Sequence, residues 1–176
     1  MIKWGLASGL TVALALWTSL FLPVAAVPAF SFAWLLHWLL MIVAVKIVPQ
    51  VLPRAVGPLT LNVGPNESRW SRRLGVLAFK RILDLIGWNR MIQKARGYSG
   101  KRGELARLTE ETWRSELGHA WALLMTCLIA IALWSSRPDV VSGLLVLAVP
   151  LHVYPILLQR LLRWRIQQLG GATATQ

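Results

Sequence analysis

Acidic residues and cysteine are scarce in this chain. It has 7 Asp and Glu residues against 19 Lys and Arg, and its single cysteine, Cys127, lies inside an apolar run. One cysteine excludes a disulfide framework within the chain and a metal site built from several thiolates. The sequence also lacks a Gly-x-Ser-x-Gly elbow, a His-Glu-x-x-His zinc pattern and a carboxylate dyad. We therefore expect neither a covalent serine hydrolase nor a metal site.

Charge of either sign is sparse outside one segment. Only 15% of the residues are charged, against about 25% in soluble proteins, whereas 56% are hydrophobic. Several of the ten tryptophans lie near the ends of apolar runs, as in an interfacial aromatic belt: Trp4, Trp34, Trp38, Trp121 and Trp134. No strand pattern is present. The composition predicts an all-α, polytopic membrane protein.

Four apolar runs have approximately the length that a helix needs to cross a bilayer. They cover residues 4–22, 29–48, 119–135 and 140–158. The first run also resembles a signal peptide, because Lys3 precedes it and Val24-Ala25-Ala26 follows it. Its length and the nearby Pro23 favour an uncleaved span. The sequence thus predicts transmembrane hairpins over residues 1–50 and 119–176.

Thirteen of the 19 Lys and Arg residues lie between Arg54 and Arg114, in the one long polar segment. The positive-inside rule explains this cluster without a nucleic-acid partner. We expect residues 51–118 to form a basic cytoplasmic loop between the second and third spans. The tail is also basic, so both termini should be cytoplasmic in a multi-pass protein of the cell membrane.

Two amphipathic helices are predicted within the basic loop, at about 66–86 and 104–118. Proline and glycine interrupt residues 51–65, and glycines punctuate residues 87–103. In the first helix, Phe79 and Ile82 fall on one side and Arg73 and Arg81 on the other. Such a helix either lies on an anionic leaflet or packs against the rest of the protein.

A histidine and several acids mark the point where the basic segment runs into the third apolar run. Glu116 precedes His119 by three residues, on the same helical face, and Glu111 lies a little over two turns earlier. A carboxylate beside an imidazole can orient it and raise its basicity, as a general base requires. The alternative is purely structural pairing at the mouth of a helix.

Polar residues also interrupt the fourth span. At helical spacing, His152, Gln159 and Arg163 share one stripe, and Pro150 and Pro155 should kink the helix beside it. Ionisable groups at membrane depth usually face the interior of a bundle and often mark a functional path.

A third histidine, His37, lies in the middle of the second span between Trp34 and Trp38. We interpret it as the partner in an interhelical hydrogen bond.

Two blocks of the second half resemble the glycosyl-4,4'-diaponeurosporenoate acyltransferase family of small bacterial membrane proteins. One is Glu111-Thr112-Trp113-Arg114-Ser115-Glu116-Leu117-Gly118-His119, which is similar to the family's Glu-Thr-x-Arg-x-Glu-x-x-His. The other is Tyr154-Pro155-Ile156-Leu157-Leu158-Gln159-Arg160, similar to its Pro-x-x-x-Gln-Arg ending. With a weaker match from Phe79 to Trp88, the resemblance reaches Arg165. Leu161 and Leu162 depart from the Tyr-Asn of that ending.

The resemblance implies transfer of a fatty acyl group to a hydroxyl of a membrane-embedded glycolipid, similar to a carotenoid or other isoprenoid glycoside. Acyl-CoA or acyl carrier protein would be the donor, with no bound cofactor. His119 would be the base and Glu116 or Glu111 its orienting partner. Residues expected to contact substrate are Arg114, His152, Gln159, Arg160 and Arg163. The alternative is a non-enzymatic membrane scaffold or assembly subunit whose basic loop binds anionic lipid or an acidic cytosolic partner.

Overall fold

The computed structural model of the chain describes residues 29–46, 62–96 and 101–171, and all secondary structure in these ranges is helical. The predicted first span at 4–22 lies outside the described residues. The chain divides into two compact units. The first, which we call the apolar unit, comprises residues 1–50 and 118–153; the second, the basic unit, comprises residues 51–117 and 154–176.

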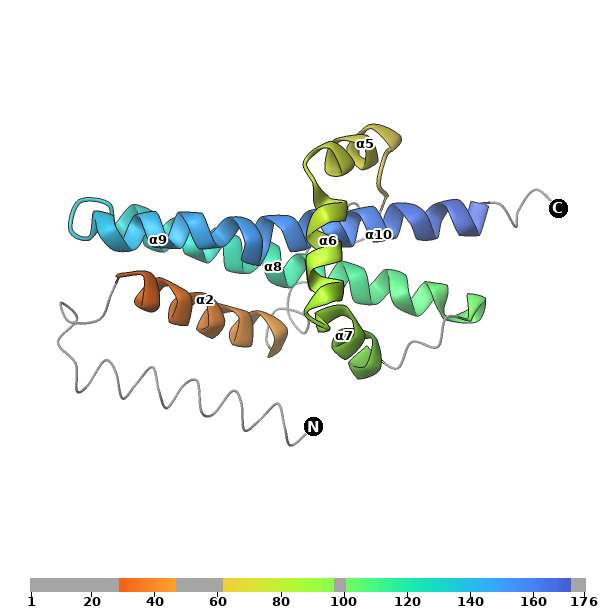
Figure 1. Cartoon of the computed structure of the whole chain (residues 1–176), viewed down its shortest axis with the longest axis horizontal. Helices are drawn as coiled ribbons and strands as arrows, with labels where there is room; N and C mark the ends of the chain where they lie inside the picture. The colour runs from red at the N-terminus through yellow and green to blue at the C-terminus, as the bar shows by residue number, and fades with distance from the viewer. Residues whose placement is uncertain (1–28, 47–61, 97–100, 172–176) are drawn as a thin grey trace. The chain divides into compact units, whose positions relative to one another are not determined.

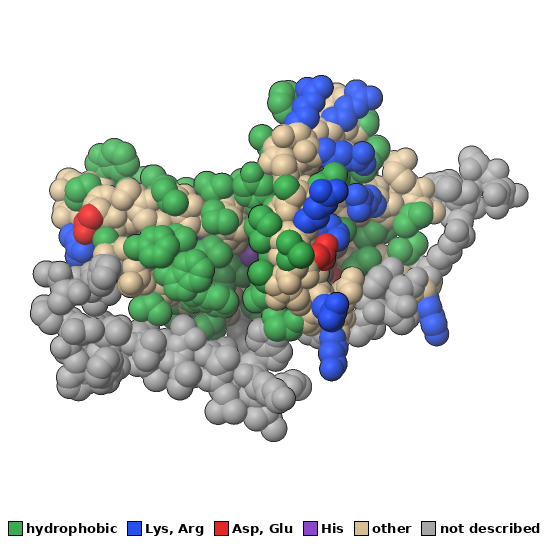
Figure 2. Space-filling model, in the orientation of Figure 1, with side chains coloured by type: hydrophobic (Ala, Val, Ile, Leu, Met, Phe, Trp, Pro, Cys, Tyr) green, Lys and Arg blue, Asp and Glu red, His purple; other side chains and the backbone are tan. Residues whose placement is uncertain are grey.

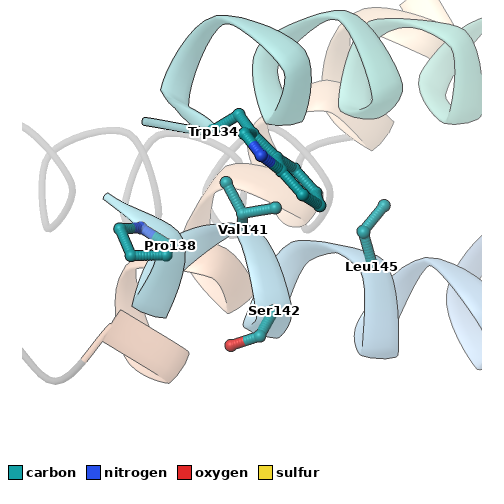
Figure 3. Close-up of a pocket in the computed structure, with 5 residues that line it drawn as sticks. All are labelled: Trp134, Pro138, Val141, Ser142 and Leu145. Carbon is teal, nitrogen blue, oxygen red and sulfur yellow. The ribbon is translucent and has the colours of Figure 1, made fainter. Parts of the chain in front are cut away.

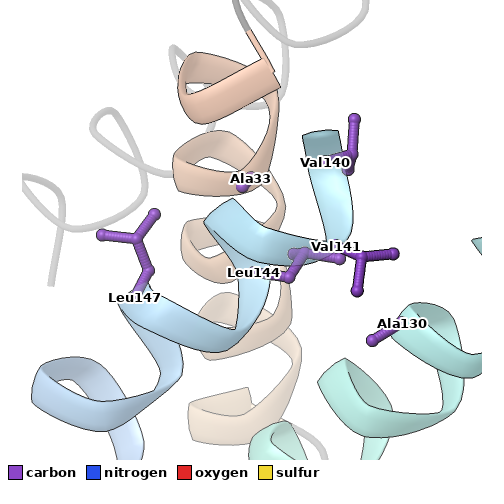
Figure 4. Close-up of a cluster of buried hydrophobic side chains, with 6 residues drawn as sticks. All are labelled: Ala33, Ala130, Val140, Val141, Leu144 and Leu147. Carbon is purple, nitrogen blue, oxygen red and sulfur yellow. The ribbon is translucent and has the colours of Figure 1, made fainter. Parts of the chain in front are cut away.

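The apolar unit contains helix α2 (Ala29–Lys46), the second half of α8 (Leu105–Leu133) and α9 (Pro138–Ala148). A π-helical turn, Val149–Val153, continues α9. Figure 1 shows α2 running alongside α9, with which it makes extensive contacts. The core between these helices consists of small and branched apolar side chains (Figure 4): Ala33, Ala130, Val140, Val141, Leu144 and Leu147.

Small residues allow these helices to approach closely. A Cβ added to Gly143 would lie 3.2 Å from the Cβ of Ala33, and one added to Gly118 would lie 3.7 Å from that of Ala44. Small residues at helix crossings are typical of membrane bundles, where close van der Waals packing drives association. These two glycines therefore bring α9 and α8 close to α2.

Much of the surface of the apolar unit is hydrophobic. Ile131, Trp134 and Val146 are each about two-thirds exposed, at 72%, 68% and 66%. Figure 2 shows hydrophobic side chains over a broad part of this unit. Large exposed apolar side chains of this kind suit lipid better than water.

The basic unit contains three short helices, α5 (Pro65–Arg73), α6 (Val76–Leu85) and α7 (Trp88–Arg96). It also contains the first half of α8, preceded by the 3₁₀ turn Arg102–Glu104, and α10 (Tyr154–Gly171). Helices α5 and α6 pack against α10. The core consists of Val76, Leu158 and Leu161. The Tyr154 hydroxyl donates a 2.9 Å hydrogen bond to the Leu74 carbonyl, which ties α10 to the α5–α6 junction.

The predicted helix at 66–86 is two helices, and the predicted loop at 87–103 contains a third, α7. Gly75 and Gly87 separate them with φ angles of 79° and 75°. Glycine adopts this left-handed conformation at little cost, and it ends or redirects a helix there. Lys80 and Asn89 donate hydrogen bonds to Asp84 near the α6–α7 junction, and these bonds lower the pKa of its carboxyl.

Two described helical stretches, Leu105–Leu133 and Pro138–Leu169, are long and apolar enough to cross a membrane. The first joins the expected amphipathic helix at 104–118 to the expected span at 119–135. This helix contains no proline, and its one glycine, Gly118, remains helical. The second extends beyond the expected 140–158 at its carboxyl end. The helix at Ala29–Val45 is apolar but shorter than these two.

Candidate functional site

All three histidines of the chain lie in the apolar unit. His37 lies in the middle of α2, His119 in α8 and His152 in the π-helical turn. His37 and His152 are fully buried, whereas His119 is half-buried. Three segments far apart in the sequence thus contribute one imidazole each.

The three rings form a continuous chain of contacts. His37 Nδ1 lies 2.8 Å from His152 Nε2, and His152 Nδ1 lies 3.5 Å from His119 Nδ1. At the other end, His37 Nε2 lies 3.0 Å from the carbonyl oxygen of Leu144. The prediction that His37 makes an interhelical hydrogen bond is confirmed, with His152 and Leu144 as its partners.

The backbone at His152 departs from the α-helix. Pro150 has no backbone N–H, so an α-helix cannot continue through it with all its hydrogen bonds. A π-helical turn of Val149–Val153 occurs at this point. Such turns interrupt α-helices at functional sites more often than elsewhere.

A second cluster of polar side chains lies in the basic unit and consists of two carboxylates and two guanidinium groups. Arg160 of α10 forms a bidentate pair with Glu67 of α5, with Nη2 3.0 Å from Oε2. Arg160 Nη1 also donates to Glu116 Oε1 over 2.8 Å. Arg163 Nη2 contacts the other oxygen, Glu116 Oε2. The four formal charges cancel.

Glu116 therefore has two arginine partners in the basic unit, while His119 contacts the imidazole of His152 in the apolar unit. The i,i+3 spacing correctly placed Glu116 and His119 on one helix. It gave no information about Arg160 and Arg163, which approach from α10. Sequence reasoning also missed Glu67, whose only signal was that acids are scarce.

The remaining predicted residues lie at different depths in the basic unit. Arg114 is exposed and pairs with Glu110 over 2.5 Å, and Glu111 is half-buried. Arg163 is fully buried. Within the described ranges, its Nε and Nη1 atoms and the Oε1 atom of Gln159 have no hydrogen-bond partner.

The same described ranges contain no group of three His, Cys, Asp or Glu residues able to hold a metal ion. A shallow pocket of about 310 Å³ lies at the turn between α8 and α9. Figure 3 shows its lining of Trp134, Pro138, Val141, Ser142 and Leu145, none of which is ionisable. The three imidazoles are therefore the better candidate for chemistry within the apolar unit.

No curated protein and no solved structure matches the chain. A family model described as glycosyl-4,4'-diaponeurosporenoate acyltransferase matches residues 57–171. This match includes both sequence blocks, His119 and His152, the ion cluster and most of the basic segment. Because it covers more than half of the 176 residues, the chain belongs to the glycosyl-4,4'-diaponeurosporenoate acyltransferase family.

Proposed function

We propose that this protein is a membrane acyltransferase that moves a fatty acyl group onto a sugar hydroxyl of a glycolipid or isoprenoid glycoside. The observation that carries the proposal is the family match over residues 57–171, which includes the half-buried His119. The scaffold alternative is not favoured, because the matched family is defined by an acyl-transfer activity.

The apolar surface supports a substrate that is embedded in the membrane. Two helices long enough to span a bilayer and large exposed apolar side chains suit a site that receives lipids laterally. The protein would then be an integral protein of the cell membrane. An acyl chain and an isoprenoid chain would both remain in hydrocarbon while their polar ends react.

The reaction needs a base and an acyl thioester. In the proposed step, His119 accepts the proton of the sugar hydroxyl while the hydroxyl oxygen attacks the thioester carbonyl carbon. The tetrahedral intermediate then collapses, the C–S bond breaks, and the imidazolium returns the proton to the thiolate. The products are a sugar ester and a thiol, so no oxidant, metal ion or bound cofactor is required.

Exposed cations in the basic unit support an anionic donor such as acyl-CoA or acyl carrier protein. Figure 2 shows Lys and Arg side chains over helices α5, α6 and α7. The exposed ones are Arg69, Arg72, Arg73, Arg81, Arg90 and Lys94. A field of one sign raises the local concentration of an oppositely charged partner and speeds its association. The exposed Arg114 belongs to the same unit and is proposed to add to this field.

The other residues expected to contact substrate differ in whether their polar atoms already have partners. The Gln159 Oε1 atom has no partner among the described residues and is proposed to accept a hydrogen bond from a substrate hydroxyl. Arg160 and Arg163 are neutralised by Glu67 and Glu116. We therefore propose that these arginines organise the basic unit rather than bind the donor.

The test is replacement of His119 by Ala, with the acylated glycolipid measured by lipid mass spectrometry at matched protein level. Loss of a general base should lower the rate of acyl transfer by about 10²–10⁴-fold. Ser136→Ala, an exposed change in the α8–α9 turn, is the control and should retain full yield. Full yield from His119→Ala would show that the histidine is not the base. His119→Gln keeps the side-chain volume and serves as a second variant for the same measurement.

A further inference from the structure

We propose that His37 and His152 are positioning residues that hold His119 in one tautomer, with its lone pair on Nε2. This inference rests on the proposed function only in taking His119 as the base. The chain of three imidazoles ends on a backbone carbonyl, and that end determines where each proton lies.

The Leu144 carbonyl locates the proton of His37. A carbonyl oxygen can only accept a hydrogen bond, so His37 Nε2, which lies 3.0 Å away, carries a proton. His37 is fully buried near the apolar core of α2 and α9, where a charged ring is costly. A neutral His37 protonated on Nε2 has its lone pair on Nδ1.

The protons of the next two rings are then located in turn. His152 Nε2, 2.8 Å from His37 Nδ1, must donate, which leaves the lone pair of a neutral His152 on Nδ1. His119 Nδ1, 3.5 Å from that lone pair, then donates to it. A neutral His119 protonated on Nδ1 carries its lone pair on Nε2, the atom that would accept the hydroxyl proton.

This arrangement gives the base a neutral orienting partner. In many hydrolytic sites a carboxylate accepts the Nδ1 hydrogen of the base and holds its ring. In this protein the Nδ1 atom of His152 occupies the accepting position, and Glu116 is engaged by Arg160 and Arg163. When His119 gains a proton, the positive charge remains on this half-buried ring, because His37 and His152 are fully buried and costlier to charge.

The packing of α2 against its neighbouring helices supports the chain of three imidazoles. The Gly143–Ala33 contact brings α9 close to α2, and the π-helical turn carries His152 to His37, with ring centroids 4.9 Å apart. The ring centroids of His119 and His152 are 5.8 Å apart. His37 lies outside residues 57–171, so the family match does not account for its position.

The experiment is nitrogen NMR of the full-length protein, labelled with ¹⁵N-histidine and reconstituted in lipid nanodiscs. Protonated and lone-pair nitrogens of imidazole have well-separated shifts, and only three histidines contribute. We expect the Nδ1–H tautomer for one ring, assigned to His119 by its loss in His119→Gln. The other two rings should be Nε2–H tautomers. A wild-type His119 in the Nε2–H tautomer would overturn the inference without any variant.

A matched pair of variants tests the positioning role. His152→Gln retains an acceptor and a donor, whereas His152→Leu removes both. The Gln variant should keep His119 in the Nδ1–H tautomer, and the Leu variant should lower the population of that tautomer. In the acyl-transfer assay, the Leu variant should lose on the order of 10–100-fold in kcat, the loss found when the hydrogen-bond partner of a metal-bound histidine is removed, with KM unchanged. An unchanged His119 tautomer in His152→Leu contradicts the role.

The two readouts separate this inference from the proposed function. The expected tautomers together with full activity of His119→Ala would leave the imidazole chain in place and refute the general base. Loss of acyl transfer in His119→Ala together with an Nε2–H tautomer of His119 would support the general base and refute the positioning role of His37 and His152.

Discussion

At the residue scale, the least usual feature is a fully buried arginine. Arg163 has a side-chain exposure of 0%, and its Glu116 partner is only 11% exposed. Removing charged groups from water costs several kcal/mol per ion, which only good geometry and pairing can offset. Arg160 adds a second cation beside Glu116, and Glu67 balances it. Each of these four side chains therefore depends on the others to offset the cost of removing its charge from water.

We expect Glu116→Gln to destabilise the protein by about 3–5 kcal/mol, because it leaves the guanidinium of Arg163 buried without its counter-charge. The measurement is the thermal midpoint of unfolding in detergent. Glu110→Gln is the matched control, since the Arg114–Glu110 pair is exposed and worth about 0.2–1 kcal/mol. Equal, small shifts for both variants would mean that Arg163 does not need Glu116.

At the element scale, two glycines divide the region before α8 into short helices. Gly75 separates α5 from α6, and Gly87 separates α6 from α7, each at positive φ. Both glycines therefore determine how the basic side chains of this region are distributed over three helices rather than one. The exposed Trp70, Leu85 and Ile86 lie on the same three-helix segment, so cations and large apolar groups are interspersed there.

Gly75 has a backbone conformation that a residue with a side chain adopts only under strain. A Cβ there meets no close neighbour, since the Tyr154 hydroxyl is 4.0 Å away, but φ is 79°. Gly75→Ala should therefore cost about 1–2 kcal/mol from backbone strain alone. Gly64→Ala is the control, because Gly64 has φ of −85° and open space around its Cβ position. The measurement is the thermal midpoint of each variant by circular dichroism. Equal midpoints for Gly75→Ala and Gly64→Ala would refute the backbone strain.

At the scale of the whole molecule, charge and hydrophobicity are segregated along the chain. The two helices long enough to cross a membrane are joined by the short turn at residues 134–137, so their outer ends face the same side if both span. The basic segment precedes the first of these helices, and Arg160, Arg163 and Arg165 lie toward the end of the second. The positive-inside rule predicts that those ends lie in the cytoplasm.

The corresponding test uses topology reporters. A reporter inserted near Gly100 or fused after Gln176 should report the cytoplasm, whereas one inserted at Ser136 should report the opposite side. The Lys and Arg asymmetry between Arg54 and Arg114 is the physical reason. An exported signal from the Gly100 insertion would overturn the orientation. A cytoplasmic signal from Ser136 would show that α8 and α9 do not span.

Local patterns in the sequence predicted the helical class, apolar helices over 29–48, 119–135 and 140–158, and the family. These properties depend on composition, on the 3.6-residue period and on motif spacing, all of which are read within one segment. Local patterns also indicated that His37 would bond to another helix, because a polar group in an apolar helix needs a partner. They placed the end of a helix at Gly87, but they did not predict the break at Gly75 or helix α7, since a glycine inside a helical pattern either remains helical, as Gly118 does, or adopts positive φ.

The partner of each polar group depends on how the helices pack in three dimensions. His37 and His152 are 115 residues apart, and Arg160 and Glu67 are 93 apart. Their contacts depend on where helices cross, and the crossing of α2 with α9 depends on Gly143 fitting against Ala33. Hydrophobic periodicity specifies which face of a helix is buried, but not the height or rotation at which another helix meets it. For that reason the sequence placed Glu116 and His119 on one helix, but it did not identify the arginines that pair with Glu116 or the imidazole that contacts His119.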